Sequence, residues 1–486
     1  MAMRFCCSFF LAIMVLCTAQ SLVADIHTAT RDFVHKTLAI DLPTSEFYDK
    51  FVKVSSASTG RPHEGFGVAI TESTAYSYGL VVDKEAFLDT LFADARINLV
   101  RLHIGSCDFS LSRWSCAEQT DDFELSSFSL ENDRKYILPL LRDIRNRYDH
   151  IRFIAAPWSP PKWMKNGDSY DYTTIPCLKE DARYHDAYAR YLSKWISEYA
   201  KEGIPISFLS VQNEVNHGRN GKSTWPACVW NGGEMARFIR DHLGPIIKKD
   251  HDGSVGIGIY DHNKHDMTTF LNDFETECPI GSDCSDLYQF ISFHYYHQRP
   301  GDFHRVKNVA DSYGNKKILA TEACNCPIVI DDVLGDYEWG ERLIHDAMKA
   351  IGSGAQSYIV WNALLLGYDI YDPHPPINGS IFKAGGPNVA YNWCNAPGHV
   401  MPSGRVWYRH EYTLLRQLSK YIEPGMEILH PDSTEHSIVA KGTDKYVFVV
   451  QNLEYDEQEI ALCIDDNCGL VNVPAFSVVT SVVALK

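Results

Sequence analysis

The sequence predicts an α/β protein whose larger part is a (β/α)8 barrel, because strand-like and helix-like segments alternate along most of its length. Between residues 64 and 361, short apolar runs of the kind expected for buried parallel strands are separated by amphipathic segments with a helical period. Eight such units in series are typical of a closed parallel barrel. The runs predicted as strands are 65–70, 97–104, 151–156, 206–212, 255–259, 290–295, 318–321 and 356–360. The clearest helical patterns cover 84–95, 129–146, 180–201 and 339–351.

The C-terminal part follows a different pattern and predicts a separate antiparallel β module. After a helical segment at 408–419, alternating runs separated by turn residues are expected for such a module. The predicted strands are 436–441, 445–451, 459–464 and 477–483. We therefore divide the chain into a barrel at 61–419 and a β domain at 420–486. The segment 25–60 is too short for a core of its own and is expected to join the β domain.

The first 24 residues are predicted to be a signal peptide. Arg4 precedes an apolar stretch at 5–17, and small residues near Ala24 offer a cleavage site. The mature chain is then secreted, or delivered to a lysosome or vacuole. The net charge of −17 argues against nucleic-acid binding, which needs concentrated basic charge. An acidic surface suits an enzyme that works at low pH, and it equally suits any soluble protein.

Cysteine usage also indicates an oxidising compartment. Three of the 14 cysteines lie in the signal peptide, and the 11 that remain are an odd number, so at least one thiol is unpaired. Short spacings suggest three bridges but leave the connectivity open: Cys107–Cys116, Cys278–Cys284 and Cys463–Cys468. The glycosylation sequon at Asn378 predicts an exposed loop. No CxxC pairs of a zinc site are present, and we expect neither metal nor cofactor.

Two of the predicted strands lead directly into glutamates, Glu214 and Glu322. Catalytic groups of a (β/α)8 barrel stand where its strands end, and hydrolysis of a glycosidic bond needs two carboxylates on opposite sides of the sugar. Both could instead be ordinary loop carboxylates among the 62 acidic residues, but their strand-end position and the adjacent Asn213 favour catalysis. Cys324 is either a catalytic thiol or a small packing residue, and the second interpretation fits better because no histidine partner is evident.

Several motifs in matching order resemble glycoside hydrolase family 30, which contains glucosylceramidases, β-1,6-glucanases and β-xylosidases. They include Arg101-Leu-His-Ile-Gly-Ser-Cys-Asp108, Ala156-Pro-Trp158-Ser-Pro-Pro-Lys-Trp163, Gln212-Asn213-Glu214, His294-Tyr-Tyr296, Thr321-Glu322-Ala-Cys324, Trp361-Asn362 and Gly385-Gly-Pro-Asn388. The resemblance implies a TIM barrel with a β-sandwich side domain and a retaining mechanism. It also makes a silent carbohydrate-binding barrel a poor alternative, since both glutamates are present.

The resemblance implies a role for each residue of the catalytic pair. Glu322 would be the nucleophile that forms a covalent glycosyl-enzyme intermediate, and Glu214 the general acid and base. Arg101 and Tyr296 would keep Glu322 ionised through charge and hydrogen bonding. Asn213 would bind the 2-hydroxyl group of the sugar.

Further substrate-binding residues are implied in the same way. Asp108 and Trp158 would bind the terminal sugar, Trp361 would lie under its ring, and Asn392 would stand near the mouth. His294 is placed among the substrate-binding residues. Together with His297 it could suggest a metal, but no further donor has the right spacing, and satisfied histidines at the end of the barrel are the better interpretation. Without the resemblance, each tryptophan would be read as core and Asp108 as a turn cap.

Departures from the glucosylceramidase pattern concern the mouth of the site. Tyr295 stands at a position where the glucosylceramidase pattern looks to have a tryptophan. The loop at 362–404 is also long. We expect glucosylceramide as the substrate, with β-1,6-glucan a close second and xylosides a further alternative. A glycolipid substrate would require brief contact with a membrane surface.

Overall fold

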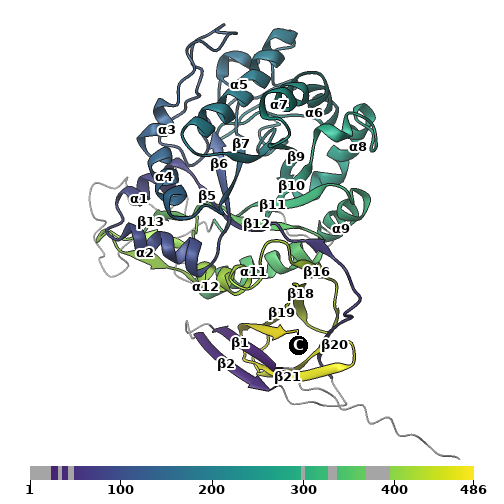
Figure 1. The fold of residues 1–486 in the computed structure, drawn as a ribbon. Helices are drawn as coiled ribbons and strands as arrows, with labels where there is room; N and C mark the ends of the chain where they lie inside the picture. The colour runs from purple at the N-terminus through teal and green to yellow at the C-terminus, as the bar shows by residue number, and fades with distance from the viewer. Residues whose placement is uncertain are drawn as a thin grey trace, which may run out of the picture.

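The computed structural model describes residues 23–30, 35–41, 49–219, 221–296, 302–326, 336–367 and 394–485. A barrel forms the larger body, and antiparallel sheets lie below it in Figure 1. Among the described helices, none is long and apolar enough to cross a membrane.

Eight parallel strands close the barrel in the order β10-β11-β12-β5-β6-β7-β8-β9. Their bounds are β5 Gly65–Ile70, β6 Leu99–Ile104, β7 Arg152–Pro157, β8 Ile206–Ser210, β9 Gly256–Asn263, β10 Phe290–His294, β11 Lys317–Ala323 and β12 Ser357–Val360. Each coincides with a predicted run, so the barrel prediction is confirmed. Most residues of these runs are apolar because helices cover one face of each strand and the packed interior covers the other. One interior layer consists of Leu99, Ile154, Phe208, Phe290, Leu319 and Ile359.

Helices surround the barrel on its outer face (Figure 1). They include α1 Glu72–Gly79, α2 Lys84–Leu88, α3 Glu131–Lys135, α4 Ile137–Arg147, α5 Ala182–Lys201, α6 Gly232–Phe238, α7 Gly244–His251, α8 Met267–Glu277, α9 Asp302–Ser312, α11 Asp336–Gly352 and α12 His410–Ser419. The single helix expected at 129–146 is two helices, α3 and α4, which meet at Tyr136. Pro139 explains the break, because it has no N–H for the carbonyl four residues earlier.

The β domain joins both ends of the described chain. One sheet has the order β2-β1-β22-β19-β18-β16-β4, and a second has the order β17-β3-β20-β21. The bounds are β1 Val23–Thr30, β2 His35–Asp41, β3 Phe51–Val54, β4 Arg61–Pro62, β16 Glu427–Leu429, β17 Asp432–Ser433, β18 His436–Lys441, β19 Lys445–Asn452, β20 Gln458–Ile464, β21 Asn467–Val473 and β22 Ser477–Ala484. Strands β1 and β3 pair with C-terminal strands, so the N-terminal segment joins this domain as expected. Strand β1 includes the last two residues of the predicted signal peptide.

The described residues contain four disulfides, and one of the three suggested bridges is wrong. Cys278–Cys284 and Cys463–Cys468 form, but Cys107 and Cys116 are buried free thiols. Their side chains belong to different hydrophobic clusters, so the short spacing does not bring the two sulfur atoms together. The other two bridges, Cys177–Cys228 and Cys326–Cys394, join residues 51 and 68 positions apart.

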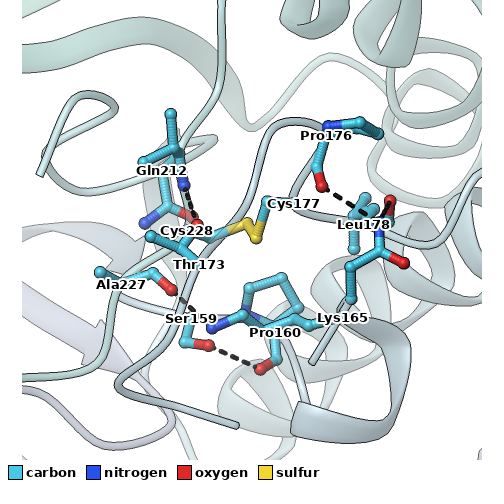
Figure 2. The surroundings of a disulfide bond; sticks show 12 residues. Ser159, Pro160, Lys165, Thr173, Pro176, Cys177, Leu178, Gln212, Ala227 and Cys228 are labelled. Carbon is cyan, nitrogen blue, oxygen red and sulfur yellow. Dashed lines mark hydrogen bonds between the residues drawn. A yellow bond between two sulfur atoms is a disulfide. The ribbon is translucent and has the colours of Figure 1, made fainter. Parts of the chain in front are cut away.

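Cys177–Cys228 joins the loops that follow β7 and β8 (Figure 2). Lys165 lies beside this bridge and is fully buried. Its Nζ donates to the carbonyl oxygens of Ala227 at 2.6 Å and Tyr170 at 3.0 Å. Burial lowers the pKa of Lys165 to about 7. Both loops are therefore held by a covalent bond and by a buried amine.

Helix α3 buries a carboxyl group against α5. The Asp133 side chain is inaccessible to solvent, and the Tyr199 hydroxyl donates to it. Burial raises the pKa of Asp133 to about 7, although the hydrogen bond from Tyr199 acts against this rise. The folded protein therefore holds this proton at pH values where an unfolded chain has lost it.

Asp133 should make the protein less stable as pH rises from about 4 to 7. Unfolding then releases a proton, and the free energy of unfolding falls by up to roughly 4 kcal/mol over this range. Asp133→Asn has no such proton and should show a shallower loss, measured by thermal or urea unfolding at several pH values. Asp149→Asn, at a fully exposed carboxylate, is the control and should follow the wild type. An unchanged slope in Asp133→Asn would contradict the assignment.

Candidate active site

The two predicted glutamates meet at the end of the barrel where the strands terminate. Glu322 is the penultimate residue of β11, and Glu214 follows β8 by four residues. One carboxylate oxygen of each lies within 4.8 Å of the other and of a ring nitrogen of His294. Glu214 has a positive φ of 52°, and its N–H donates to the Asp261 carbonyl oxygen at 2.8 Å. A left-handed backbone at a non-glycine residue is strained and is found at functional sites.

Arg101, on β6, connects the acidic residues of the site. It is fully buried, and its Nη1 donates to Glu322 Oε2 at 2.6 Å. Its Nη2 donates to Asp261 Oδ2 at 2.9 Å and to Asn213 Oδ1 at 2.8 Å. Burial alone would lower the pKa of Arg101, but the charges of Asp261 and Glu322 raise it. The guanidinium is therefore a permanent cation that both carboxylates surround.

Asp261, at the end of β9, is a site residue that the sequence analysis missed. Burial would raise its pKa, but the charge of Arg101 and a hydrogen bond from His294 hold that pKa far below its ordinary value. Thr321 also donates to this carboxylate. The available signal was the one that identified the two glutamates: a carboxylate where an apolar run ends. The run predicted at 255–259 ends four residues before β9 does, so Asp261 falls outside it.

The second oxygen of Glu322 is also occupied. The Tyr296 hydroxyl donates to Glu322 Oε1 at 2.9 Å. A carboxylate that accepts hydrogen bonds on both oxygens, one of them from a cation, is stabilised in its ionised form. The Cys324 sulfur lies 3.3 Å from the same hydroxyl oxygen, and burial raises the pKa of this thiol. Cys324 is therefore a neutral packing group and not a thiolate nucleophile.

Three histidines surround the other carboxylate, Glu214. The Nδ1 atoms of His294 and His262 lie 3.6 Å and 3.8 Å from Oε1, and the Nδ1 of His217 lies 3.8 Å from Oε2. Burial opposes a charge on His294, but Glu322 and a hydrogen bond with Asp261 raise its pKa to about 9. Burial would raise the pKa of Glu214, but His294 and the other two imidazoles lower it. Within this buried pair the pKa of His294 is thus raised while that of Glu214 is lowered. His217 and His262 were not among the predicted site residues.

Aromatic side chains and a second carboxyl group form the opposite side of the site. The rings of Trp158 and Trp361 stack with centroids 5.1 Å apart, and the Arg101 guanidinium lies over both. Within the described residues, Asp108 Oδ1 and Trp361 Nε1 are buried atoms without a hydrogen-bond partner. Burial raises the pKa of Asp108, and the charges of Glu322 and Glu214 raise it further. A ligand rich in hydroxyl groups would satisfy both atoms.

The structure brings most of the predicted site residues together. These are Arg101, Asp108, Trp158, Asn213, Glu214, His294, Tyr296, Glu322 and Trp361. Asn392, the sequon at Asn378 and most of the long loop lie outside the described residues. Tyr295 is buried, and its hydroxyl donates to Asn325.

The donors of Glu214, His294 and Glu322 are close enough to ligate a metal ion. Arg101 already places a cation beside Glu322. The expectation that the site needs no metal stays a prediction.

A barrel whose strand ends present two facing glutamates beside aromatic rings, with a β-sandwich attached, defines a glycoside hydrolase. The chain belongs to glycosyl hydrolase family 30, whose TIM-barrel domain model matches residues 63–422.

Relatives within this family differ in their substrates. The lysosomal acid glucosylceramidase of Mus musculus is 24% identical over 424 residues, which cover 83% of this chain and 77% of that protein. An endo-1,6-β-D-glucanase of Neurospora crassa is 28% identical over 207 residues, covering 41% of this chain and 42% of that protein. The solved structure of the endo-β1,6-glucanase BT3312 superposes with a TM-score of 0.77 at 25% identity, covering 96% of this chain and all of that one. The family is therefore established, and the substrate is not determined by these likenesses.

Replacing Asp261 should damage both stability and activity. Asp261→Asn leaves the buried Arg101 with one carboxylate fewer, and breaking a buried ion pair typically costs about 3–5 kcal/mol. We expect a lower unfolding temperature, and a drop of at least about tenfold in kcat on a β-glucoside, because Arg101 no longer holds Glu322 in one orientation. Asp283→Asn, on an exposed loop, is the control. Full activity in Asp261→Asn would show that Arg101 needs no second carboxylate.

Proposed function

We propose that this protein is a retaining β-glucosidase, with Glu322 as nucleophile and Glu214 as acid and base. The separation of the two carboxylates carries this proposal. Retaining enzymes place the two groups roughly 5–5.5 Å apart, and inverting enzymes leave roughly 6.5–9.5 Å for a water molecule. Here one carboxylate oxygen of Glu214 lies within 4.8 Å of one carboxylate oxygen of Glu322, which supports direct attack by Glu322.

In the first step, Glu322 attacks the anomeric carbon, and the glycosidic oxygen leaves as an alcohol. Arg101 and Tyr296 orient the attacking carboxylate. The proton comes from the His294–Glu214 pair. As Glu322 becomes an ester, its negative charge no longer stabilises the His294 cation, so the proton passes through Glu214 to the leaving oxygen.

In the second step, water replaces the alcohol and attacks the same carbon. Glu214 is now a carboxylate beside a neutral His294, and it takes the proton of that water. Release of the sugar restores the Glu322 carboxylate, and the proton returns to His294, where Glu322 and Asp261 stabilise it. The charge of Glu322 thus decides at each step whether the shared proton is held or given away.

The sugar bound by this site is proposed to be a terminal β-linked glucose. Asp108 Oδ1 and Trp361 Nε1 have no partner among the described residues, and two of its hydroxyl groups would pair with them. Glucosylceramide is the first candidate substrate, supported by the likeness to a glucosylceramidase over most of the chain. A β-1,6-linked glucan is the second, supported by the likeness to a glucanase structure over 96% of the chain. Four disulfides support the expected secreted or lysosomal location.

Glu322→Gly should abolish hydrolysis, because no covalent intermediate can form. Added azide should enter the vacated space and give a glucosyl azide of inverted configuration, identified by NMR. The same product from Glu214→Ala instead would reverse the two assignments.

Glu214→Ala should spare substrates whose leaving group needs little protonation. The fall in kcat/KM on 2,4-dinitrophenyl β-glucoside should be at least about tenfold smaller than on an alkyl β-glucoside. Azide should raise the rate and give a product of retained configuration, because the nucleophile is intact. Equal losses on both substrates with no azide effect would remove Glu214 from this role.

A further inference from the structure

A polar cleft of about 390 Å³ opens beside the histidines that face Glu214. Two of its lining residues, His217 and His262, are the imidazoles that face the two oxygens of the Glu214 carboxylate. The glycosidic oxygen must lie next to the acid that protonates it, so the group attached to that oxygen extends into the space beside Glu214. The cleft is therefore positioned to receive the leaving group.

The described lining of this cleft contains no aliphatic side chain. Besides the two histidines it includes Asn216, Arg219, Lys222 and Asp266. Asn216 Nδ2 donates to Asp266 at 3.0 Å, and Arg219 Nη1 donates to the Asn216 oxygen at 3.2 Å. Alkyl chains bind by burying apolar area, which this surface does not offer. Hydroxyl groups of a sugar can pair with amide, imidazole and charged groups alike.

Trp225 lies between His217, which lines the cleft, and the cluster that contains the two stacked tryptophans. One side of this residue packs against the cluster that contains Trp158 and Trp361. The His217 ring lies on it with centroids 4.0 Å apart and planes 9° from parallel. The imidazole therefore covers an indole face that could otherwise stack on a sugar, and recognition on this side falls to the polar edge of His217.

Ser223 sets the orientation of His217. The Trp225 N–H donates to Ser223 Oγ at 3.1 Å, and Oγ lies 2.8 Å from His217 Nε2. The hydroxyl hydrogen is thus available to donate to Nε2, which places the imidazole proton on Nδ1. The opposite tautomer would aim a nitrogen lone pair at the Glu214 carboxylate, so the Nδ1–H form is favoured electrostatically.

We propose that this cleft is a leaving-group subsite for a second sugar residue, and that His217 determines this specificity by donating from Nδ1 to a hydroxyl of that sugar. The inference rests on the proposed β-glucosidase activity and adds the chemical class of the leaving group. It favours a saccharide over a lipid alcohol at this position, and so places the β-1,6-linked glucan ahead of glucosylceramide as the substrate.

The test compares kcat/KM on a β-1,6-linked glucose disaccharide with kcat/KM on octyl β-glucoside. The wild type should prefer the disaccharide, and His217→Ala should reduce the ratio of the two values by about five- to tenfold, the effect of one hydrogen bond. His217→Asn, whose amide nitrogen can replace Nδ1, should recover part of the ratio. His150→Ala is the control. His150 lies before β7, at the opposite end of the barrel, and its replacement should leave the ratio unchanged.

Ser223→Ala separates orientation from packing. It should lower the ratio in the wild-type background and have no further effect in His217→Ala, because it acts through the imidazole. An unchanged ratio in His217→Ala, or an Asn variant as poor as the Ala variant, would overturn the proposal. Hydrolysis of octyl and 4-nitrophenyl β-glucosides without hydrolysis of the disaccharide would overturn it and leave the proposed function intact. Inactivity on all three would overturn both.

Discussion

The buried guanidinium of Arg101 is the constraint around which the site is arranged. A cation this far from solvent is tolerated only when charged partners and hydrogen bonds compensate for its lost hydration. Asp261 and Glu322 supply the charge, and Asn213 supplies a further acceptor. Arg101 and these three partners come from four different strands or strand ends, so the position of the nucleophile depends on closure of the whole barrel.

The same cluster fits the charge that develops in glycoside hydrolysis. In the resting state of the proposed mechanism, the buried groups comprise two cations, Arg101 and His294, and three anions, Asp261, Glu214 and Glu322. The balance is one negative charge, in a region largely shielded from water. An oxocarbenium-like sugar carries positive charge and is stabilised by such preorganised groups. Burial, together with the charges of Glu322 and Glu214, raises the pKa of Asp108 and so disfavours a further negative charge there.

Strand irregularities direct these side chains toward one point. The pairing of β10 with β9 shifts register between Ser292 and Phe293, and its pairing with β11 shifts between Phe293 and His294. Tyr260, Asp261 and Asn362 have positive φ values, as does Glu214. Bulges and left-handed residues of this kind change the direction of side chains at the ends of strands. The apolar cluster inside the barrel, which includes Leu99, Ile154 and Phe208, helps to offset this strain.

Sequence reasoning recovered what depends on local pattern and missed what depends on distant contacts. The eight strands were predictable because a strand buried on both faces reads as an unbroken apolar run. The prediction ended strand β9 too early because its last residues, from Tyr260 to Asn263, do not continue the apolar run. The buried carboxylate among them, Asp261, is stabilised by Arg101 and His294, which are distant in sequence. Strand β21 was missed because glycine and asparagine interrupt its alternation. The bridges over 51 and 68 residues follow from tertiary contact, which spacing alone cannot reveal.

The two sides of the site are held by different means, and this difference bears on specificity. The groups proposed to bind the sugar come from strand ends or pack directly against them, as Arg101, Trp158 and Trp361 do. His217 and Trp225 lie instead on the long loop after β8. A loop alone would hold them poorly, since backbone ordering is entropically unfavourable. The Cys177–Cys228 bridge ties that loop to the one after β7, and the buried Lys165 amine binds the carbonyl oxygen next to the bridge. The leaving-group side can therefore differ between barrels of one fold while the strand-end groups keep their positions, and a clamped loop still positions an imidazole to within hydrogen-bonding tolerance.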